Sequence, residues 1–587
     1  MEILKKGLKV FKNFFKHFFI EVVKTFFKLI ILGLVILGIT KYVKNQQKLP
    51  SIENKTYVVI EMPKVLGESK TKTLFDLNHQ ENFYDFLKEL DIMKKDKRVK
   101  GLILKLNNYG LNRAQTEEVK IKIRELRKEG KIIYAYLDYI NNRNYSLALE
   151  AKSIIIPNTN FIISEIAGYS SNYPYYKSLG DNLGLEAEII HIGDFKSYGE
   201  NYKNTHMSKE FSENTRRIYN ILYENYVGDI ARKRNLAKDE ISKKILSGDF
   251  IMSSADNLKD SKLIDQVIYY EDFLAKNEIS NYLSKEEYLA RYYQEEKSEN
   301  KSDENKIAIL YLEGNIILND NSKKVEKVIT PEAVKEKLRI INKDKRIKGV
   351  VLRVNSPGGS ALASDLIYKS LKEFKKPVYV SMGGVAASGG YFISAAGDKI
   401  YADKESITGS IGVVTIIPNA SKLLKKIGIN YDQITNNKYD TNMGIYRKLS
   451  PEMKNKIYNS SIGSYNEFLS KMSISRKMKI SDIEKIAGGR VWLGSEAKEI
   501  GLVDEIGGLE KTISDLALKL GINDYKVVEA IKQEKFESLL KTILPKYIFK
   551  DIIGNDLLVN EFKNMKEFTL QEELLRRPIL YATDTKF

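Results

Sequence analysis

The chain has 587 residues, an apolar fraction of 43% and a formal net charge of +18. Its length predicts several domains, and its apolar content excludes a disordered chain. It contains no cysteine, which excludes disulfides, thiolate catalysis and cysteine-based zinc sites. The positive charge does not indicate a nucleic-acid partner, because the lysines are spread along the chain among 77 acidic residues.

The amino end has the pattern of a membrane anchor. Residues 1–24 alternate aromatic and lysine residues, a basic amphipathic pattern suited to a membrane surface. The apolar run that follows is long enough to span a membrane over about 26–43 if Lys28 reaches the interface. We expect neither a removed signal peptide, since no small-residue cleavage site follows, nor a buried core helix, since lysines flank the run. Lysines are denser on the amino side, so the positive-inside rule predicts a cytoplasmic amino end and extracytoplasmic domains.

An internal repeat organises the rest of the chain. Residues 96–105 return as residues 344–353, with six of the ten positions identical and the other four conservatively replaced. The other matching pairs are 57–60 with 307–310, 131–136 with 377–381, and 262–265 with 501–504. Apolar β runs that alternate with helical patterns predict βαβ units, with a parallel sheet covered by helices in each copy.

The composition divides the chain into five parts. We expect a basic tail and a single transmembrane anchor over 1–48, and the first repeat over 49–293. A polar linker over 294–305 leads to the second repeat over 306–535. A lysine-rich, helical carboxyl-terminal tail is expected over 536–587.

Chemistry is predicted where the two copies differ. The second copy has Asn-Ser-Pro-Gly-Gly-Ser at 355–360 and Gly-Gly-Val-Ala-Ala-Ser-Gly-Gly-Tyr at 383–391, and the first copy has neither. A strand that runs into small residues, one serine and then a helix exposes the Ser388 hydroxyl beside free backbone N–H groups. Gly359 is the best candidate for a second oxyanion donor. Either turn alone would be read as a tight connection, but both in one copy favour a site; in the first copy Asn142 stands opposite Ser388.

A serine nucleophile needs a base, and the second copy contains no histidine. The first copy offers Lys196, and the matching position of the second copy is Asp440. Because the first copy lacks the serine and the second lacks the lysine, one site assembled from both copies explains both differences. Burial would have to lower the pKa of this lysine from about 10.4 towards 7–8. His191 and His206 are the rival bases.

These residues resemble the signal peptide peptidase A family of serine peptidases, family S49, in its long, double-length form. The resemblance rests on the anchor, the repeat and a set of motifs: residues 355–360, 386–391, 408–412, 195–197 and 489–492. It implies that Ser388 is the nucleophile, Lys196 the general base and Ser410 a residue that hydrogen-bonds the lysine. Phe195 stands where the family has a tyrosine, which is a conservative departure.

The resemblance also implies an α/β fold with tandem domains of the Clp-protease and crotonase type, built from ββα units behind the transmembrane helix. The expected activity is that of an endopeptidase that degrades cleaved signal peptides at the inner (cytoplasmic) membrane, as a homotetramer and without metal or organic cofactor. Backbone N–H groups at Gly359 and Gly389 would hold the oxyanion. The alternatives are an inactive membrane scaffold of the same fold and a crotonase-like enzyme acting on acyl-CoA.

Overall fold

The computed structural model describes residues 49–70, 81–107, 109–159, 161–296, 305–319, 327–432, 434, 436, 446–530 and 579–581, with a few isolated residues between 24 and 31. Within these ranges no helix combines the length and the apolar character that a membrane span requires. The anchor expected over about 26–43 lies almost wholly outside them, as does the tail expected to be helical from 536. The exception in the tail is residues 579–581, which form a strand and not a helix.

The first repeat is built on a parallel sheet, because its strands are apolar runs separated by helical segments. Its order is β8-β5-β3-β2-β1-β9, and every neighbouring pair is parallel. The strands are β1 (Thr56–Glu61), β2 (Val99–Lys105), β3 (Ile132–Tyr136), β5 (Ser153–Ile156), β8 (Gln266–Val267) and β9 (Tyr282–Ser284). A small separate pair is formed by β4 (Tyr139–Asn141) and β6 (Ile163–Glu165).

The second repeat reproduces this sheet. The order β20-β16-β15-β13-β10-β21 matches that of the first repeat, again with parallel pairs, and β17 and β19 extend the sheet beside β15. The strands are β10 (Asn305–Glu313), β13 (Ile347–Ser356), β15 (Val378–Ala387), β16 (Lys399–Ala402), β17 (Ile407–Gly409), β19 (Val491–Leu493), β20 (Glu505–Ile506) and β21 (Tyr525–Glu529). Even the register irregularity recurs, between Thr56 and Tyr57 in one copy and Lys306 and Ile307 in the other. The predicted tandem α/β repeat is therefore confirmed.

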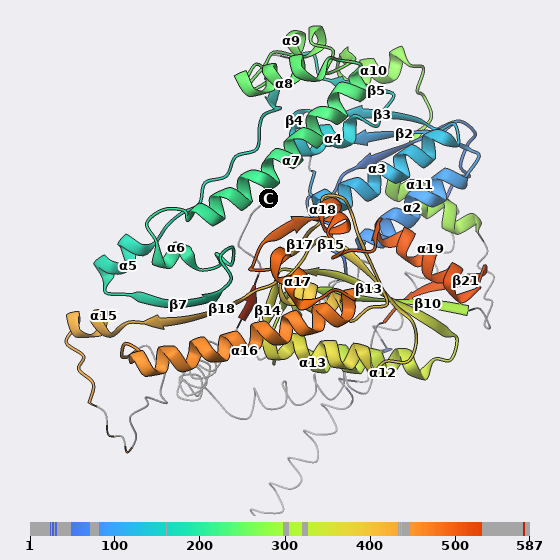
Figure 1. The fold of residues 1–587 in the computed structure, drawn as a ribbon. Helices are drawn as coiled ribbons and strands as arrows, with labels where there is room; N and C mark the ends of the chain where they lie inside the picture. The colour runs from blue at the N-terminus through green and yellow to red at the C-terminus, as the bar shows by residue number, and fades with distance from the viewer. Residues whose placement is uncertain are drawn as a thin grey trace, which may run out of the picture.

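Helices cover both sheets, as Figure 1 shows. In the first repeat they are α2 (Phe83–Lys95), α3 (Arg113–Lys128), α4 (Asn142–Ala148), α5 (Lys177–Leu183), α6 (Glu200–Lys203), α7 (Lys209–Arg234), α8 (Lys238–Ser247), α9 (Ala255–Asp260), α10 (Tyr270–Lys276) and α11 (Lys285–Glu295). In the second they are α12 (Pro331–Lys343), α13 (Ala361–Lys372), α14 (Gly389–Ser394), α15 (Ser421–Lys426), α16 (Pro451–Arg476), α17 (Ile480–Ile486), α18 (Gly494–Glu499) and α19 (Leu509–Leu520).

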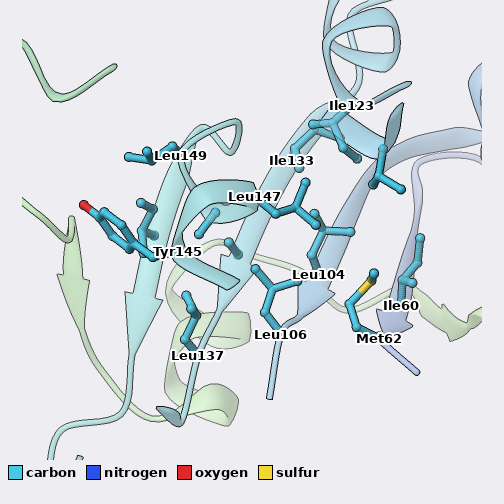
Figure 2. Packing of buried hydrophobic residues seen from close by; sticks show 14 of the residues in the cluster. Ile60, Met62, Leu104, Leu106, Ile123, Ile133, Leu137, Tyr145, Leu147 and Leu149 are labelled. Atoms are coloured by element: carbon cyan, nitrogen blue, oxygen red, sulfur yellow. The ribbon is translucent and has the colours of Figure 1, made fainter. Parts of the chain in front are cut away.

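Both faces of each sheet are buried. Successive strand residues point to opposite faces, and in β1 the side chains of Val58 and Ile60 join one apolar cluster while Val59 joins another. Figure 2 shows the first of these clusters, in which Leu104 of the sheet lies between Ile60 of β1 and Leu147 of α4. Burial on both faces explains why the strands are continuous apolar runs in the sequence.

The long helices α7 and α16 are fastened to their sheets in the same way. Each contains 26 residues, begins after a serine N-cap and ends at a residue with a left-handed backbone. The last arginine of each helix forms an ion pair with the aspartate directly before β8 or β20, Arg234 with Asp265 and Arg476 with Asp504. The correspondence extends to structural details that the sequence match only suggests.

A third sheet joins the two repeats. Its order is β12-β11-β14-β22-β18-β7, from β12 (Val328–Ile329), β11 (Asn315–Ile316), β14 (Gly358–Ser360), β22 (Ile579–Tyr581), β18 (Val413–Asn419) and β7 (Glu186–Ile192). Strand β7 of the first repeat runs antiparallel to β18 of the second over its whole length. These strands form an arm that projects from the two domains beside α16 (Figure 1). The arm carries a segment of the first repeat into the second.

A buried ion network also connects the repeats. Arg353 of β13 is fully buried, and its guanidinium donates to Glu68 and Glu118 of the first repeat at 2.7–3.1 Å. The same guanidinium donates to the Ser381 hydroxyl at 2.9 Å. Because Arg353 is two residues before Asn355, this network fixes the end of β13 at the beginning of the 355–360 turn.

Candidate active site

Ser388 is presented by a sharp turn from strand to helix. It follows the last residue of β15 and precedes α14. Its backbone has φ +54°, a left-handed conformation that a non-glycine residue rarely adopts. The turn is held because the Ser388 N–H donates to the Gly409 carbonyl at 2.8 Å and its own carbonyl accepts from Phe392 at the same distance. The turn therefore fixes the direction of the hydroxyl.

Lys196 is delivered by the arm. Strand β7 ends at Ile192, and a tight turn follows in which the Lys196 N–H donates to the Gly193 carbonyl at 3.1 Å. Opposite this turn, Gly489 has φ +85°, and a Cβ there would lie 2.4 Å from the Lys196 nitrogen. Only glycine lets the two backbones approach so closely. The lysine side chain is fully buried at the end of this turn.

The structure brings three of the predicted site residues into direct contact. The Lys196 Nζ lies 2.7 Å from the Ser388 Oγ, 2.9 Å from the Ser410 carbonyl oxygen and 3.0 Å from the Ser410 Oγ. A neutral amine has two N–H donors and one lone pair. Its donors match the two Ser410 oxygens, which leaves the lone pair for the Ser388 hydroxyl.

Ser410 is itself held in a constrained position. Its backbone has φ +51° and its N–H donates to the Arg490 carbonyl at 2.8 Å. Both the carbonyl and the hydroxyl of Ser410 thereby face Lys196. The geometry of a lysine bonded by this serine is the one expected from the resemblance.

Burial lowers the pKa of Lys196 well below its ordinary value of 10.5. Among the described residues, the hydrogen-bond partners of the Lys196 amine are the oxygens of two serines and include no carboxylate. Lys120 shows the opposite outcome, because it is also buried but lies 2.8 Å from Glu117 and 3.2 Å from Asp229. These carboxylates raise the pKa of Lys120 in spite of its burial. The surroundings of Lys196 thus favour the neutral amine, whereas those of Lys120 favour the ammonium.

The two predicted oxyanion glycines lie next to each other. Gly389 is the first residue of α14, and a Cβ on it would lie 3.2 Å from the Gly359 nitrogen. Gly359 has φ +150°, and a Cβ on it would lie 2.0 Å from the Ile316 carbonyl oxygen, so this position also requires glycine. The 355–360 and 383–391 turns, which the sequence analysis assigned to one site, thus approach each other.

The two histidines offered as rival bases have surroundings different from those of Lys196. His191 is exposed on β7, and the His206 Nδ1 contacts the neighbouring Thr205 hydroxyl at 3.1 Å. Across the described ranges, no histidine makes a hydrogen bond with Ser388. Asp440, the counterpart of Lys196, lies outside the described residues. Asn142, the counterpart of Ser388, exchanges two hydrogen bonds with the Ala167 backbone, at 2.7 and 3.0 Å.

Sequence reasoning gave no individual role to the 488–490 turn, although residues 489–492 were among the motifs. The turn contributes three contacts: Gly488 accepts a hydrogen bond from the Phe195 N–H at 2.9 Å, Gly489 admits the Lys196 backbone, and Arg490 holds Ser410. The Arg490 guanidinium also lies 3.9 Å from the centre of the Phe195 ring. The only signal in the sequence was the pair of adjacent glycines before Arg490, which marks a tight turn but not its partner.

In the part of the chain that the structure describes, no group of three or more histidine, cysteine or acidic side chains is arranged to hold a metal ion. The arrangement of Ser388, Lys196, Ser410 and the two glycines contains a nucleophile, a base and backbone donors. It can perform acyl transfer by covalent catalysis.

Comparison with known proteins agrees with this chemistry. The model of peptidase family S49 matches residues 125–283 and 370–523, one segment in each repeat, and the Clp protease model matches residues 298–406. The chain is 29% identical to Protease 4 of Haemophilus influenzae over 555 residues, covering 88% of both chains. It is 28% identical to the chloroplastic serine protease SPPA of Arabidopsis thaliana, covering 82% of this chain and 72% of that one. It is 37% identical to a putative signal peptide peptidase SppA of Enterococcus faecium over 195 residues, which are 33% of this chain and 57% of that one.

Proposed function

Since this chain belongs to peptidase family S49 and is a serine peptidase, we propose that Ser388 is its nucleophile and Lys196 its general base. The observation that carries the proposal is the 2.7 Å contact between a fully buried lysine amine and the hydroxyl of a serine at a strand-to-helix turn. Clp protease-like domains in tandem, with the lysine on one and the serine on the other, give the protein one such site per chain.

The proposed reaction begins with the neutral Lys196 amine. Its lone pair accepts the Ser388 proton as Oγ attacks the peptide carbonyl, while both remaining N–H groups stay bonded to Ser410. The developing oxyanion is stabilised by the backbone N–H groups of Gly359 and Gly389. The protonated lysine then gives its proton to the leaving amine, and a water molecule, activated by the same lysine, hydrolyses the acyl-enzyme. The short-lived ammonium keeps both Ser410 oxygens as partners, and its third N–H is the one given to the leaving amine.

We further propose that the enzyme is a single-pass protein of the inner (cytoplasmic) membrane, anchored by residues 26–43 with the amino end cytoplasmic. This rests on the apolar run and its asymmetric lysines. Its proposed substrates are cleaved signal peptides, in keeping with the name of the Enterococcus faecium relative. Endopeptidase action and assembly as a homotetramer rest on the family resemblance of the sequence.

The proposal is tested by peptide hydrolysis with the detergent-solubilised full chain and a fluorogenic signal-peptide-like substrate. Ser388→Ala and Lys196→Ala should each abolish turnover while circular dichroism shows an unchanged fold. Ser164→Ala is the matched control, because Ser164 is equally buried but bonds the Phe250 carbonyl in the first repeat, away from the site. Turnover by Ser388→Ala at the wild-type rate would refute the assignment.

A further inference from the structure

Two arginines and two aromatic rings form a stack beside the candidate active site. The Arg490 guanidinium lies 3.9 Å from the centre of the Phe195 ring and 5.6 Å from that of the Trp492 ring. The Arg217 guanidinium lies 4.6 Å from the centre of the same Trp492 ring. A guanidinium close to an aromatic face is attracted by the quadrupole of the ring. These contacts join the four residues in the order Phe195, Arg490, Trp492, Arg217, which we call the arginine stack.

Helix α7 of the first repeat holds the arginine stack against the second repeat. Its Glu213 forms an ion pair with Arg490 at 3.2 Å. Its Arg217 forms an ion pair with Glu496 and donates a hydrogen bond to the Val491 carbonyl at 2.5 Å. Each guanidinium of the stack therefore has a carboxylate partner as well as a ring, so its position is fixed from two sides.

Arg490 connects the two turns that meet at the lysine amine. Its guanidinium lies on the ring of Phe195, and Phe195 directly precedes Lys196 in the chain. Its backbone carbonyl accepts the Ser410 N–H at 2.8 Å. The two Ser410 oxygens are partners of the Lys196 amine. One residue thus joins the turn that carries Lys196 to the turn that carries Ser410.

Trp492 connects the same stack to the turn of the proposed nucleophile. A Cβ on Gly409 would lie 2.7 Å from the Trp492 Cδ1, so the ring packs directly on the backbone of Gly409. The Gly409 carbonyl accepts the Ser388 N–H at 2.8 Å. The indole N–H of Trp492 donates to the Ile486 carbonyl at 3.0 Å, which fixes the orientation of the ring. The arginine stack therefore also touches the support of Ser388.

We propose that Arg490 is a positioning residue, which holds the Lys196 turn at its distance from Ser410 by binding the Phe195 ring with its guanidinium. The proposal rests on the function proposed above, since it takes Lys196 to be the base. In this role Arg490 acts on the reaction through Phe195 and needs no contact with the substrate. Its loss should therefore slow the chemical step and leave substrate binding unchanged.

The test compares wild type with Arg490→Met, which removes the guanidinium and keeps the backbone carbonyl that holds Ser410. Loss of one partly desolvated contact between a cation and a ring should lower kcat about tenfold, with KM within about twofold of wild type. Arg490→Lys should lose less, because an ammonium is also attracted to an aromatic face. An unchanged kcat in Arg490→Met, or a loss that appears in KM alone, would overturn the proposal.

Lys105→Met is the matched control. The Lys105 Nζ lies 4.3 Å from the centre of the Tyr270 ring and 3.4 Å from the Glu61 carboxylate, so this variant also takes a cation away from a ring and a carboxylate. The two side chains are similarly exposed, 28% for Lys105 and 24% for Arg490. Both kcat and KM of Lys105→Met should stay within about twofold of wild type. A kcat as low as that of Arg490→Met would show a general effect of losing such a cation and would overturn the proposal.

A double-mutant cycle asks whether Arg490 acts through Phe195. Phe195→Leu removes the ring, and it should lower kcat about tenfold, as Arg490→Met does. Two residues that act through one shared contact are not additive, so the double variant should lose no more than the more affected single variant. Losses that multiply to about 100-fold would mean that Arg490 acts by another route, and the proposal would be wrong.

A labelling measurement separates this proposal from the proposed function. In the Ser388→Ala background, which needs no turnover, acetic anhydride should acetylate the buried Lys196 amine about tenfold faster when Arg490→Met is added, because the turn opens more often. Mass spectrometry of the peptide that contains Lys196 measures the rate, which Lys105→Met should leave unchanged. Equal rates with and without Arg490→Met overturn the positioning role even if wild type cleaves peptides. Faster labelling supports it even if wild type cleaves none, an outcome that would refute the proposed function alone.

Discussion

Gly489 offers the sharpest test of how Lys196, the proposed base, is positioned. In Gly489→Ala, the new Cβ would lie 2.4 Å from the backbone nitrogen of Lys196 and 2.5 Å from the Cα of Lys196, whereas ordinary van der Waals contact begins at 3.4 Å. The obstacle is backbone on both sides, so side-chain rotation cannot relieve it. The turn that carries Lys196 must therefore move by about 1 Å, which for a catalytic group costs on the order of 100-fold in rate.

The same substitution has a predictable cost in stability. An alanine at φ +85° costs about 1–2 kcal/mol, and the overpacking adds about 1–3 kcal/mol. Gly428→Ala is the matched control, since Gly428 has φ +84° and nothing within 4 Å of the position of its Cβ. The control should carry the backbone cost alone and keep its activity.

The assay measures kcat/KM for peptide hydrolysis together with the free energy of unfolding in denaturant. We expect kcat/KM of Gly489→Ala to fall about 100-fold, and that of Gly428→Ala to stay within about twofold of wild type, under conditions in which both variants are folded. If Gly489→Ala is as active as Gly428→Ala, the close packing of this turn does not position the base and the reasoning fails.

Four further outcomes are expected. Lys196→Arg should be inactive although it keeps the charge, because a guanidinium does not lose its proton in proteins; activity above that of Lys196→Ala would contradict a proton-accepting role. The rate of hydrolysis should rise with pH through the pKa of Lys196, which burial holds well below 10.5, and a kcat/KM profile that is flat between about pH 5 and pH 10 would argue against a lysine base. Lys196→Met should melt at a higher temperature than wild type at neutral pH, because the unfolded wild-type chain binds a proton at Lys196 that the buried amine does not. The stability of wild type therefore rises with pH between the lowered pKa of Lys196 and about 10.4, and the difference in melting temperature should shrink over that range. A difference that stays constant with pH would contradict this prediction. Arg353→Met should lower the free energy of unfolding by about 3–5 kcal/mol, because Glu68 and Glu118 stay buried without their partner; a loss below about 1 kcal/mol would show that the network is not needed.

Much of the fold follows from local patterns in the sequence. The parallel sheets were predictable because strands buried on both faces contain consecutive apolar residues, as at 102–104 in β2 and 350–352 in β13, and because most elements of the two sheets appear twice in the sequence. The third sheet was not predictable. Its strands β11, β12, β14 and β22 have only two or three residues each, too few to show a period, and β22 comes from a segment where a helix was expected.

The site was predictable to the extent that the two copies differ. Ser388 and Lys196 stand out because the other copy has a different residue at each position, Asn142 in place of the serine and Asp440 in place of the lysine. What joins them is the pairing of β7 with β18, which depends on contacts between residues more than 200 positions apart. No local pattern encodes such a pairing, so the roles of Gly489 and Arg490 in holding the base and Ser410 emerged only from the packed structure.

The hydrogen bonds of Asn142 limit how this protein can change. A serine at this position would be too short to reach both the N–H and the carbonyl of Ala167, so a step back towards a hydroxyl would loosen the join between β4 and β6. The position in the first repeat that corresponds to Ser388 therefore has a structural role. The proposed site also needs both repeats, because Lys196 lies on the first and Ser388 on the second, so deleting either repeat would remove one of its two reacting groups.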